Sequence, residues 1–152
     1  EGHVADEIAN ALDRVRRPSF SLTLSGVHAF GSRKPHSIYA GVAASPDLSA
    51  LQAEIERICQ RLGLPADPRK FVPHVTVARL RNSSPADVAR YLSARGNFSA
   101  VPFRVGRFVL MSSRESVGGG PYIVEEAWPL LGGEGSRPGL ADRAAGASWL
   151  PR

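Results

Sequence analysis

Residues 71–79 of the chain read Phe71-Val72-Pro73-His74-Val75-Thr76-Val77-Ala78-Arg79. The stretch is rich in β-branched side chains, which favour extended backbone, so we expect a strand over residues 71–80. Successive side chains of a strand point to opposite faces. His74 and Thr76 therefore share one face, whereas Val75 and Val77 share the other face and can enter the core.

The face with His74 and Thr76 carries side chains that suit chemistry on a phosphate. An imidazole takes up or releases a proton near neutral pH, and a threonine hydroxyl can hold a phosphate oxygen. Arg79 adds a permanent positive charge, but simple alternation puts it on the face opposite His74, so its contribution needs a strand end or a β-bulge. The alternative is that His74 is structural, Thr76 is an ordinary strand former and Arg79 is a surface charge.

Helices are predicted on both sides of this strand. Apolar residues recur every three or four positions over residues 4–15 and 48–62, which is typical of amphipathic helices. Gly63 stands where the second of these helices should end. A third helix is expected to begin after a Ser84 cap, with Pro85 in its first turn, and to run to Gly96.

Strands are predicted at residues 20–26, 36–42, 103–112 and 122–126. The strands at 20–26 and 36–42 should form an antiparallel pair. Because the strands arrive in adjacent pairs between helices, the order favours an α+β fold over a doubly wound parallel sheet.

The composition is that of one soluble globular domain. The chain has 152 residues, of which 43% are hydrophobic and 22% are charged. We expect a folded domain over residues 1–130 and a flexible tail over residues 131–152, which are rich in glycine and have no sustained period. No run approaches the roughly 20 apolar residues that a membrane helix needs, so no membrane association is expected.

The charge balance and the single cysteine narrow the function classes. With 19 Lys and Arg against 14 Asp and Glu, the net charge is +5, which favours an anionic partner without naming it. Cys59 alone cannot build a disulfide framework or a cysteine-rich zinc site, and it fits a reducing, cytoplasmic setting. Its side chain is expected to be inert packing.

Residues 71–80 resemble the second His-x-Thr-x motif of the two-histidine phosphoesterases, and most of all the RNA 2',3'-cyclic phosphodiesterases, historically called 2'-5' RNA ligases. Other segments are similar to that family as well: residues 20–26 and 38–42, the helix at 51–63, and residues 110–113 followed by Gly120-Pro121-Tyr122. The resemblance covers about residues 1–130. It implies a bilobed α+β fold in which antiparallel sheets line a central cleft and helices lie outside.

The resemblance also implies a reaction. In such proteins water opens a 2',3'-cyclic phosphate to a 2'-phosphate without metal or cofactor, one histidine removing the water's proton and another protonating the departing ribose oxygen. His74 would be the proton acceptor, with Thr76 and Arg79 as phosphate contacts. The expected substrates are RNA ends or cyclic nucleotides, and the protein is expected to be a monomer. Ligation of RNA through a 2'-5' bond stays open as a second activity.

Two further residues are candidates for substrate binding. Tyr122 could stack on an unpaired base, the alternative being burial of its ring in the core. His36 could lie near the mouth of the cleft, the alternative being a histidine in a loop. The basic groups Arg14-Arg16-Arg17 and Arg33-Lys34 could attract RNA phosphates, although exposed basic residues are more often simply solvated.

The chain departs from the family pattern because it holds one His-x-Thr-x motif. His3, His28 and His36 are not followed by threonine two positions later. Ser21-Leu22-Thr23-Leu24 is explained more simply as an amphipathic strand than as a degenerate first motif.

Two explanations for the missing motif stay open. The sequence is either a fragment without its N-terminal strands or a diverged, non-catalytic RNA-binding or nucleotide-binding module. The start at Glu1 favours the fragment. This chain alone is then expected to be impaired in catalysis, and the lost strands would leave an edge or an apolar face uncovered.

Overall fold

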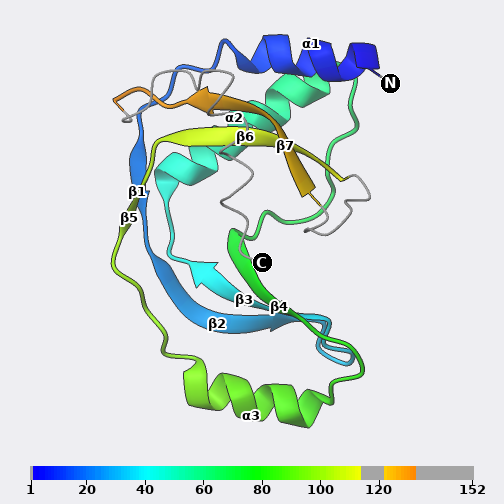
Figure 1. Cartoon of the computed structure of the whole chain (residues 1–152), viewed down its shortest axis with the longest axis vertical. Coiled ribbons are helices and arrows are strands. Elements are labelled where there is room, and N and C mark those ends of the chain that lie inside the picture. The colour runs from blue at the N-terminus through cyan, green and yellow to red at the C-terminus, as the bar shows by residue number, and fades with distance from the viewer. Residues whose placement is uncertain (1, 114–121, 133–152) are drawn as a thin grey trace. The chain divides into compact units, whose positions relative to one another are not determined.

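The computed structural model describes residues 2–113 and 122–132 (Figure 1). Its elements follow one another in the order α1 (Gly2–Leu12), β1 (Phe20–Leu22), β2 (Leu24–Phe30), β3 (Ser37–Val42), α2 (Pro46–Arg61), β4 (His74–Arg79), α3 (Pro85–Arg95), β5 (Phe103–Val105), β6 (Arg107–Ser113) and β7 (Tyr122–Pro129). The predicted α+β fold with antiparallel sheets is confirmed.

The chain divides into two compact units. The described part of the first unit contains residues 2–20, 47–66, 104–113 and 122–132, and the second unit contains residues 21–46 and 67–103. A short two-stranded sheet pairs β1 with β5.

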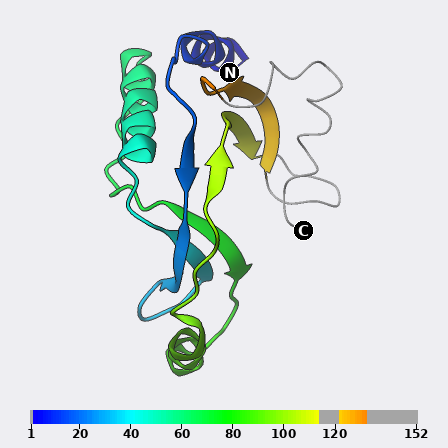
Figure 2. The ribbon, with the colours of Figure 1, turned by 90° about the vertical axis from the view of Figure 1, so that its left-hand side faces the viewer.

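The second unit is a three-stranded antiparallel sheet with one helix. The strand order is β2-β3-β4, so β3 is central and β4 is an edge among the described strands. Helix α3 lies beside the sheet next to β2, as Figures 1 and 2 show. Ile38 and Ala40 on β3 and Val88 on α3 are buried. This apolar packing leaves the other face of the sheet for the residues that could carry chemistry.

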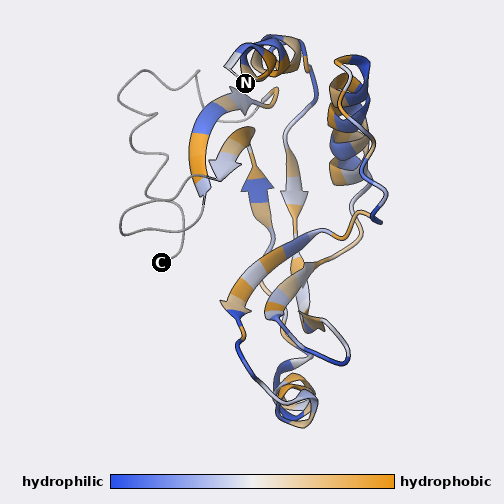
Figure 3. Cartoon of the chain, turned by 90° about the vertical axis from the view of Figure 1, so that its right-hand side faces the viewer, coloured by the Kyte–Doolittle hydropathy of each residue, from blue (hydrophilic) through white to orange (hydrophobic). Residues whose placement is uncertain are grey.

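The first unit contains helices α1 and α2 and the hairpin β6–β7. Figure 3 shows polar and apolar bands along the helices, as expected for amphipathic segments. Trp128 on β7 stacks on Phe108 of β6 with the ring centroids 5.2 Å apart, and its indole N–H donates to Asp13 Oδ1 at 2.6 Å. The hairpin is thereby tied to the turn that follows α1. The buried apolar side chains of this unit are Leu12, Val15, Phe20, Leu51, Trp128 and Leu130.

The end of α2 and the start of α3 agree with the sequence, whereas α1 ends at Leu12 and not at residue 15. Ser84 Oγ accepts a hydrogen bond from the Asp87 amide at 3.1 Å, and Pro85 occupies the first turn of α3. Gly63 follows α2 with φ of 89°, a left-handed conformation that glycine adopts without strain.

Several strand bounds differ from the prediction. β2 does not end near Gly26 but continues to Phe30, because Gly26 adopts φ of 77° at a shift in register and its amide donates to Phe98 O. β4 begins at His74 rather than at residue 71. The stretch predicted as one strand at 103–112 is divided at Gly106 into β5 and β6, and β7 extends to Pro129.

The predicted tail lies mostly outside the described residues. Of residues 131–152, the structure describes Leu131 and Gly132, and residues 133–152 fall outside it. Leu131 pairs with the segment after α1, donating its amide to Arg17 O and accepting from the Ser19 amide, each at 2.8 Å. No helix in the described part of the chain is long and apolar enough to cross a membrane.

The bond between Trp128 and Asp13 gives a prediction about stability. Trp128→Phe keeps a ring against Phe108 but removes the indole donor, so we expect the free energy of unfolding to fall by about 2 kcal/mol. Trp128→Ala also leaves a cavity and should lower it by about 3–5 kcal/mol. Urea denaturation followed by circular dichroism measures both changes, with Tyr91→Phe on the exposed part of α3 as control. Equal unfolding midpoints for Trp128→Phe and the parent chain would contradict this account.

Cys59 on α2 gives a prediction about reactivity. Partial burial raises the pKa of the Cys59 thiol, and the neighbouring Glu56 carboxylate raises it further. A raised pKa means less thiolate at a given pH, so iodoacetamide should modify Cys59 at pH 8 more slowly than it modifies a cysteine in a short peptide. Mass spectrometry gives the two rates, and Glu56→Gln should speed the reaction. A rate equal to that of the peptide would show that the thiol is not shielded.

Candidate functional site

The candidate site is one face of the three-stranded sheet in the second unit. Paired residues on neighbouring strands share a face. His74 is opposite Gly41 and Thr76 is opposite Tyr39, so both side chains lie on the Tyr39 face of β3. The predicted common face of His74 and Thr76 is therefore confirmed, and both residues are exposed.

A β-bulge in β4 brings Arg79 to this same face. Ile38 pairs with Ala78 and Tyr39 pairs with Thr76, which leaves Val77 as an extra residue without a partner on β3. Beyond the bulge Arg79 is opposite Ser37. Ser37 is two positions from Tyr39 and shares its face. The irregularity that the sequence analysis required for Arg79 is thus present.

The ring of His74 has a fixed tautomer. Its Nδ1 atom lies 2.6 Å from the carbonyl oxygen of Val72. Because a carbonyl oxygen can only accept, Nδ1 must carry the proton of this bond. In the neutral ring Nε2 then has a free lone pair. His74 is consequently arranged to accept a proton at Nε2.

Two aromatic rings pack against His74 from the neighbouring strands. Phe30 on β2 and Tyr39 on β3 meet it edge-on, with centroid distances of 5.0 Å and 5.5 Å. Phe30 and Tyr39 also stack on each other at 4.1 Å. Edge-to-face packing of this kind restricts how an imidazole can turn. Together with the Val72 carbonyl, it holds the ring of His74 in one orientation.

Two more histidines join this cluster. His28 packs on Tyr39 at 5.4 Å, and His36 stacks on Phe30 at 6.2 Å. Among the described residues no two imidazoles are in ring contact, because Phe30 or Tyr39 stands between each of them and His74. His36 is exposed in the segment just before β3, and its stacking on Phe30 places it beside the candidate face.

Gly41 keeps the strands close beside His74. A Cβ atom at Gly41 would lie 2.6 Å from the carbonyl oxygen of Ser25 and 3.1 Å from the ring of His28. A backbone oxygen cannot move aside as a flexible side chain can. Glycine at this position therefore allows β2 to approach β3 directly opposite the candidate proton acceptor.

The other face of β4 is not core. Val75 and Val77 are 40% and 59% exposed, so the prediction that they enter the core is wrong for the described structure. The reason is the place of β4 at the edge of the sheet, where no described strand or helix covers these valines.

The loop before β4 is held by a local ion pair. Arg69 Nη2 donates to Asp67 Oδ2 at 2.7 Å, and the Arg69 amide donates to Oδ1 at 3.0 Å. These hydrogen bonds from Arg69 lower the pKa of Asp67 to about 2. The pair therefore persists at neutral pH and restrains the chain between α2 and β4.

Tyr122 does not lie on the sheet that carries His74. It belongs to the first unit, at the start of β7 opposite Ser113, and it is 45% exposed. The alternative of core burial for its ring is therefore wrong. The structure does not bring Tyr122 and His74 into one unit.

The sequence analysis missed three residues of the cluster, which are His28, Phe30 and Tyr39. His28 and Phe30 were overlooked because the predicted strand stopped at Gly26. Extending the alternation past that glycine would have placed both on one face of β2. In the described part of the chain, no three His, Cys, Asp or Glu side chains gather as metal ligands would.

Comparison with known proteins identifies the family of this chain. A family model described as the 2'-5' RNA ligase superfamily matches residues 2–116. An RNA 2',3'-cyclic phosphodiesterase of Geobacillus stearothermophilus is 32% identical over 124 residues, which are 79% of this chain and 38% of that protein. One of Aeropyrum pernix is 33% identical over 82 residues, which are 53% of this chain and 47% of that protein. The chain thus spans less than half of the length of either relative.

The fold also resembles a solved structure. E. coli LigT complexed with 3'-AMP superimposes with a TM-score of 0.65 at 24% identity, over 86% of this chain and 71% of that one. At this identity the likeness concerns the fold. Because the family model covers most of the sequence, the chain belongs to the 2'-5' RNA ligase superfamily.

Proposed function

We propose that this chain carries the proton-accepting half of an RNA 2',3'-cyclic phosphodiesterase site. The observation that carries the proposal is the presence of His74, Thr76 and Arg79 on one exposed face of the sheet. A phosphate placed against that face would meet a proton acceptor, a hydroxyl donor and a permanent positive charge. These are the groups that displacement at phosphorus needs.

The reaction follows from these groups. Nε2 of His74 removes a proton from the attacking water, whose oxygen forms the new bond to phosphorus. The bond from phosphorus to the ribose 3' oxygen breaks, and that oxygen takes a proton from a general acid. Thr76 and Arg79 stabilise the charge that collects on the phosphoryl oxygens. The product is a 2'-phosphate with a free 3'-hydroxyl.

The general acid needs a second proton carrier. We propose that it is a histidine from a second His-x-Thr-x motif, which the 152 residues do not contain. In that case this chain alone hydrolyses slowly or not at all. If an RNA 5'-hydroxyl replaces the water, the same displacement forms a 2'-5' phosphodiester, which is the ligation named by the family.

The comparisons support the substrate class. Both curated relatives are named RNA 2',3'-cyclic phosphodiesterases, and the E. coli structure holds 3'-AMP, a nucleotide with its phosphate on the ribose. Cyclic nucleotides and RNA ends are therefore the ligands to test first on this chain.

A second candidate function is a non-catalytic nucleotide-binding module. The single His-x-Thr-x motif favours it, because binding a phosphate needs Thr76 and Arg79 but no second proton carrier. The two functions differ in what His74 does. An enzyme loses turnover without the imidazole, whereas a binding module retains most of its affinity.

Hydrolysis of a short RNA with a 2',3'-cyclic phosphate end tests the proposal. EDTA is present, and this chain is compared with a form extended before Glu1 to include a second His-x-Thr-x motif. We expect turnover in the extended form and a 10²–10⁴-fold lower rate in its His74→Ala variant, the range for loss of a general base. Arg79→Ala should lower the rate by about 10², since it removes one charge from the phosphoryl oxygens.

His3→Ala is the matched control, because His3 is an exposed histidine on α1 that pairs only locally with Glu7. Its rate should equal that of the parent. A folded extended form that binds the RNA without hydrolysing it would replace the enzyme with the binding module. Full activity of His74→Ala would exclude His74 as the base.

The packing of Phe30 on His74 gives a separate prediction. Phe30→Ala removes an aromatic ring 5.0 Å from the imidazole, so the NMR signals of the His74 ring should move and broaden as the ring gains freedom. Two-dimensional histidine spectra of the labelled chain measure this change. Phe98→Ala is the control in the same unit, because Phe98 makes no described ring contact with His74. Unchanged His74 signals in Phe30→Ala would contradict the proposed restraint.

A further inference from the structure

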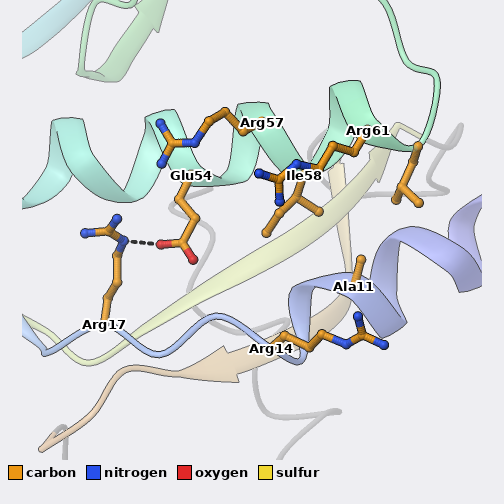
Figure 4. Close-up of a pocket in the computed structure, with 8 residues that line it drawn as sticks. Ala11, Arg14, Arg17, Glu54, Arg57, Ile58 and Arg61 are labelled. Carbon is orange, nitrogen blue, oxygen red and sulfur yellow. Dashed lines mark hydrogen bonds and ion pairs between the residues drawn. The ribbon is translucent and has the colours of Figure 1, made fainter.

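A basic pocket lies in the first unit, between the end of α1 and one side of α2. It has a volume of about 470 Å³, within the usual range for small-molecule sites. Figure 4 shows Arg17 pointing to Glu54 of α2, Arg57 and Arg61 lying along α2, and Arg14 lying beside the end of α1. The lining residues are Ala11, Arg14, Arg17, Glu54, Arg57, Ile58, Arg61 and Leu62.

The charges of this pocket are not balanced. Of its four arginines, Arg17 donates from Nε to Glu54 Oε2, and Glu54 is the one carboxylate among the described lining residues. Arg14, Arg57 and Arg61 line the pocket without a carboxylate partner among the residues that the structure describes. Three positive charges therefore face one cavity, and an anion would offset their repulsion.

The helix geometry concentrates two of these charges. Arg57 and Arg61 are four positions apart on α2, so they project from the same side of the helix one turn apart. Like charges at this spacing destabilise a helix. Arg14 joins them from the turn after α1, where its own amide donates to Ala11 O. Arg16 does not contribute, since its guanidinium donates to the carbonyl oxygens of Asp13 and Val15.

The Arg17–Glu54 pair has a structural role. Both side chains are about two thirds buried, and their contact joins the segment after α1 to α2. It fixes one wall of the pocket and keeps Arg17 from competing for a ligand. Arg17 therefore has a structural role in the pocket, and the other three arginines can bind a ligand.

The lining also indicates the kind of anion. Guanidinium groups bind phosphate oxygens through paired hydrogen bonds. At pH 7 a single phosphate carries about two negative charges and so does not balance three guanidinium groups, whereas two or three linked phosphates do. No aromatic side chain lines the described part of the pocket, so it offers no platform for stacking a base. Ala11, Ile58 and Leu62 provide only a small aliphatic surface.

We propose that this pocket binds a small ligand through a chain of two or three linked phosphates, with Arg14, Arg57 and Arg61 as the binding residues. A nucleoside triphosphate and an inorganic polyphosphate share this chemistry. The site is separate in sequence and in unit from His74, Thr76 and Arg79. It does not depend on the phosphodiesterase function.

Calorimetry with sodium tripolyphosphate tests the proposal on the full chain at low salt. We expect a saturable site for tripolyphosphate in addition to weaker binding at the His74 face, at least tenfold weaker binding of inorganic phosphate to the pocket, and weaker binding of both ligands as salt increases. The double variant Arg57→Gln/Arg61→Gln should bind tripolyphosphate at least tenfold more weakly. The melting temperature of this double variant should be no lower than that of the parent chain, because the substitutions remove two like charges one helical turn apart. ATP should bind with the same affinity as tripolyphosphate if the pocket contacts only the phosphates. A higher affinity for ATP would indicate that the ligand is a nucleotide.

Arg33→Gln/Arg81→Gln is the matched control, since both are exposed arginines of the second unit and the charge change is equal. It should retain the parent affinity for tripolyphosphate, and so should His74→Ala. If the control variant lost as much affinity for tripolyphosphate, net charge alone would explain the loss in the pocket variant, and the proposal would be overturned. The proposal would also fail if inorganic phosphate bound as tightly as tripolyphosphate, or if only single-stranded RNA bound in a manner that needs Arg57 and Arg61.

Discussion

One unpaired residue in an edge strand decides which side chains of this protein can act together. His74 and Arg79 are five positions apart, and in a regular strand they would face opposite ways. The extra residue Val77 shifts the register, so Arg79 lies opposite Ser37 on the face of Tyr39. A bulge is tolerated there because β4 pairs on one side only among the described strands. The candidate phosphate site therefore depends on an irregularity.

Residues on the neighbouring strands of this sheet orient the imidazole ring of His74. The Val72 carbonyl fixes the proton of His74 on Nδ1, while Phe30 and Tyr39 pack against the ring edge-on. Gly41 lets β2 approach at the same level. These restraints come from three segments of the second unit, which are β2, β3 and the residues just before β4. These contacts hold the ring of the candidate proton acceptor in one orientation, which suits acid–base chemistry.

Much of this arrangement follows from sequence and some of it does not. Alternation placed His74 and Thr76 together, and the Ser84 cap marked the start of α3 correctly. The position of Arg79 could not be predicted, because a bulge is a property of two paired strands. The exposure of Val77 depends on strand order for the same reason. The basic pocket could not be predicted either, since Arg14 and Arg57 line one cavity only when the segments that carry them pack together.

The central claim is that His74, Thr76 and Arg79 hold one phosphate from one face. Titration of the labelled chain with adenosine 2',3'-cyclic phosphate, followed by side-chain NMR, tests it most directly. The account predicts that the His74 ring, the Thr76 methyl group and the Arg79 guanidinium shift along one saturation curve. If His74 and Thr76 shift while the Arg79 signals stay at their free positions, the bulge does not bring Arg79 to the site and the account is wrong.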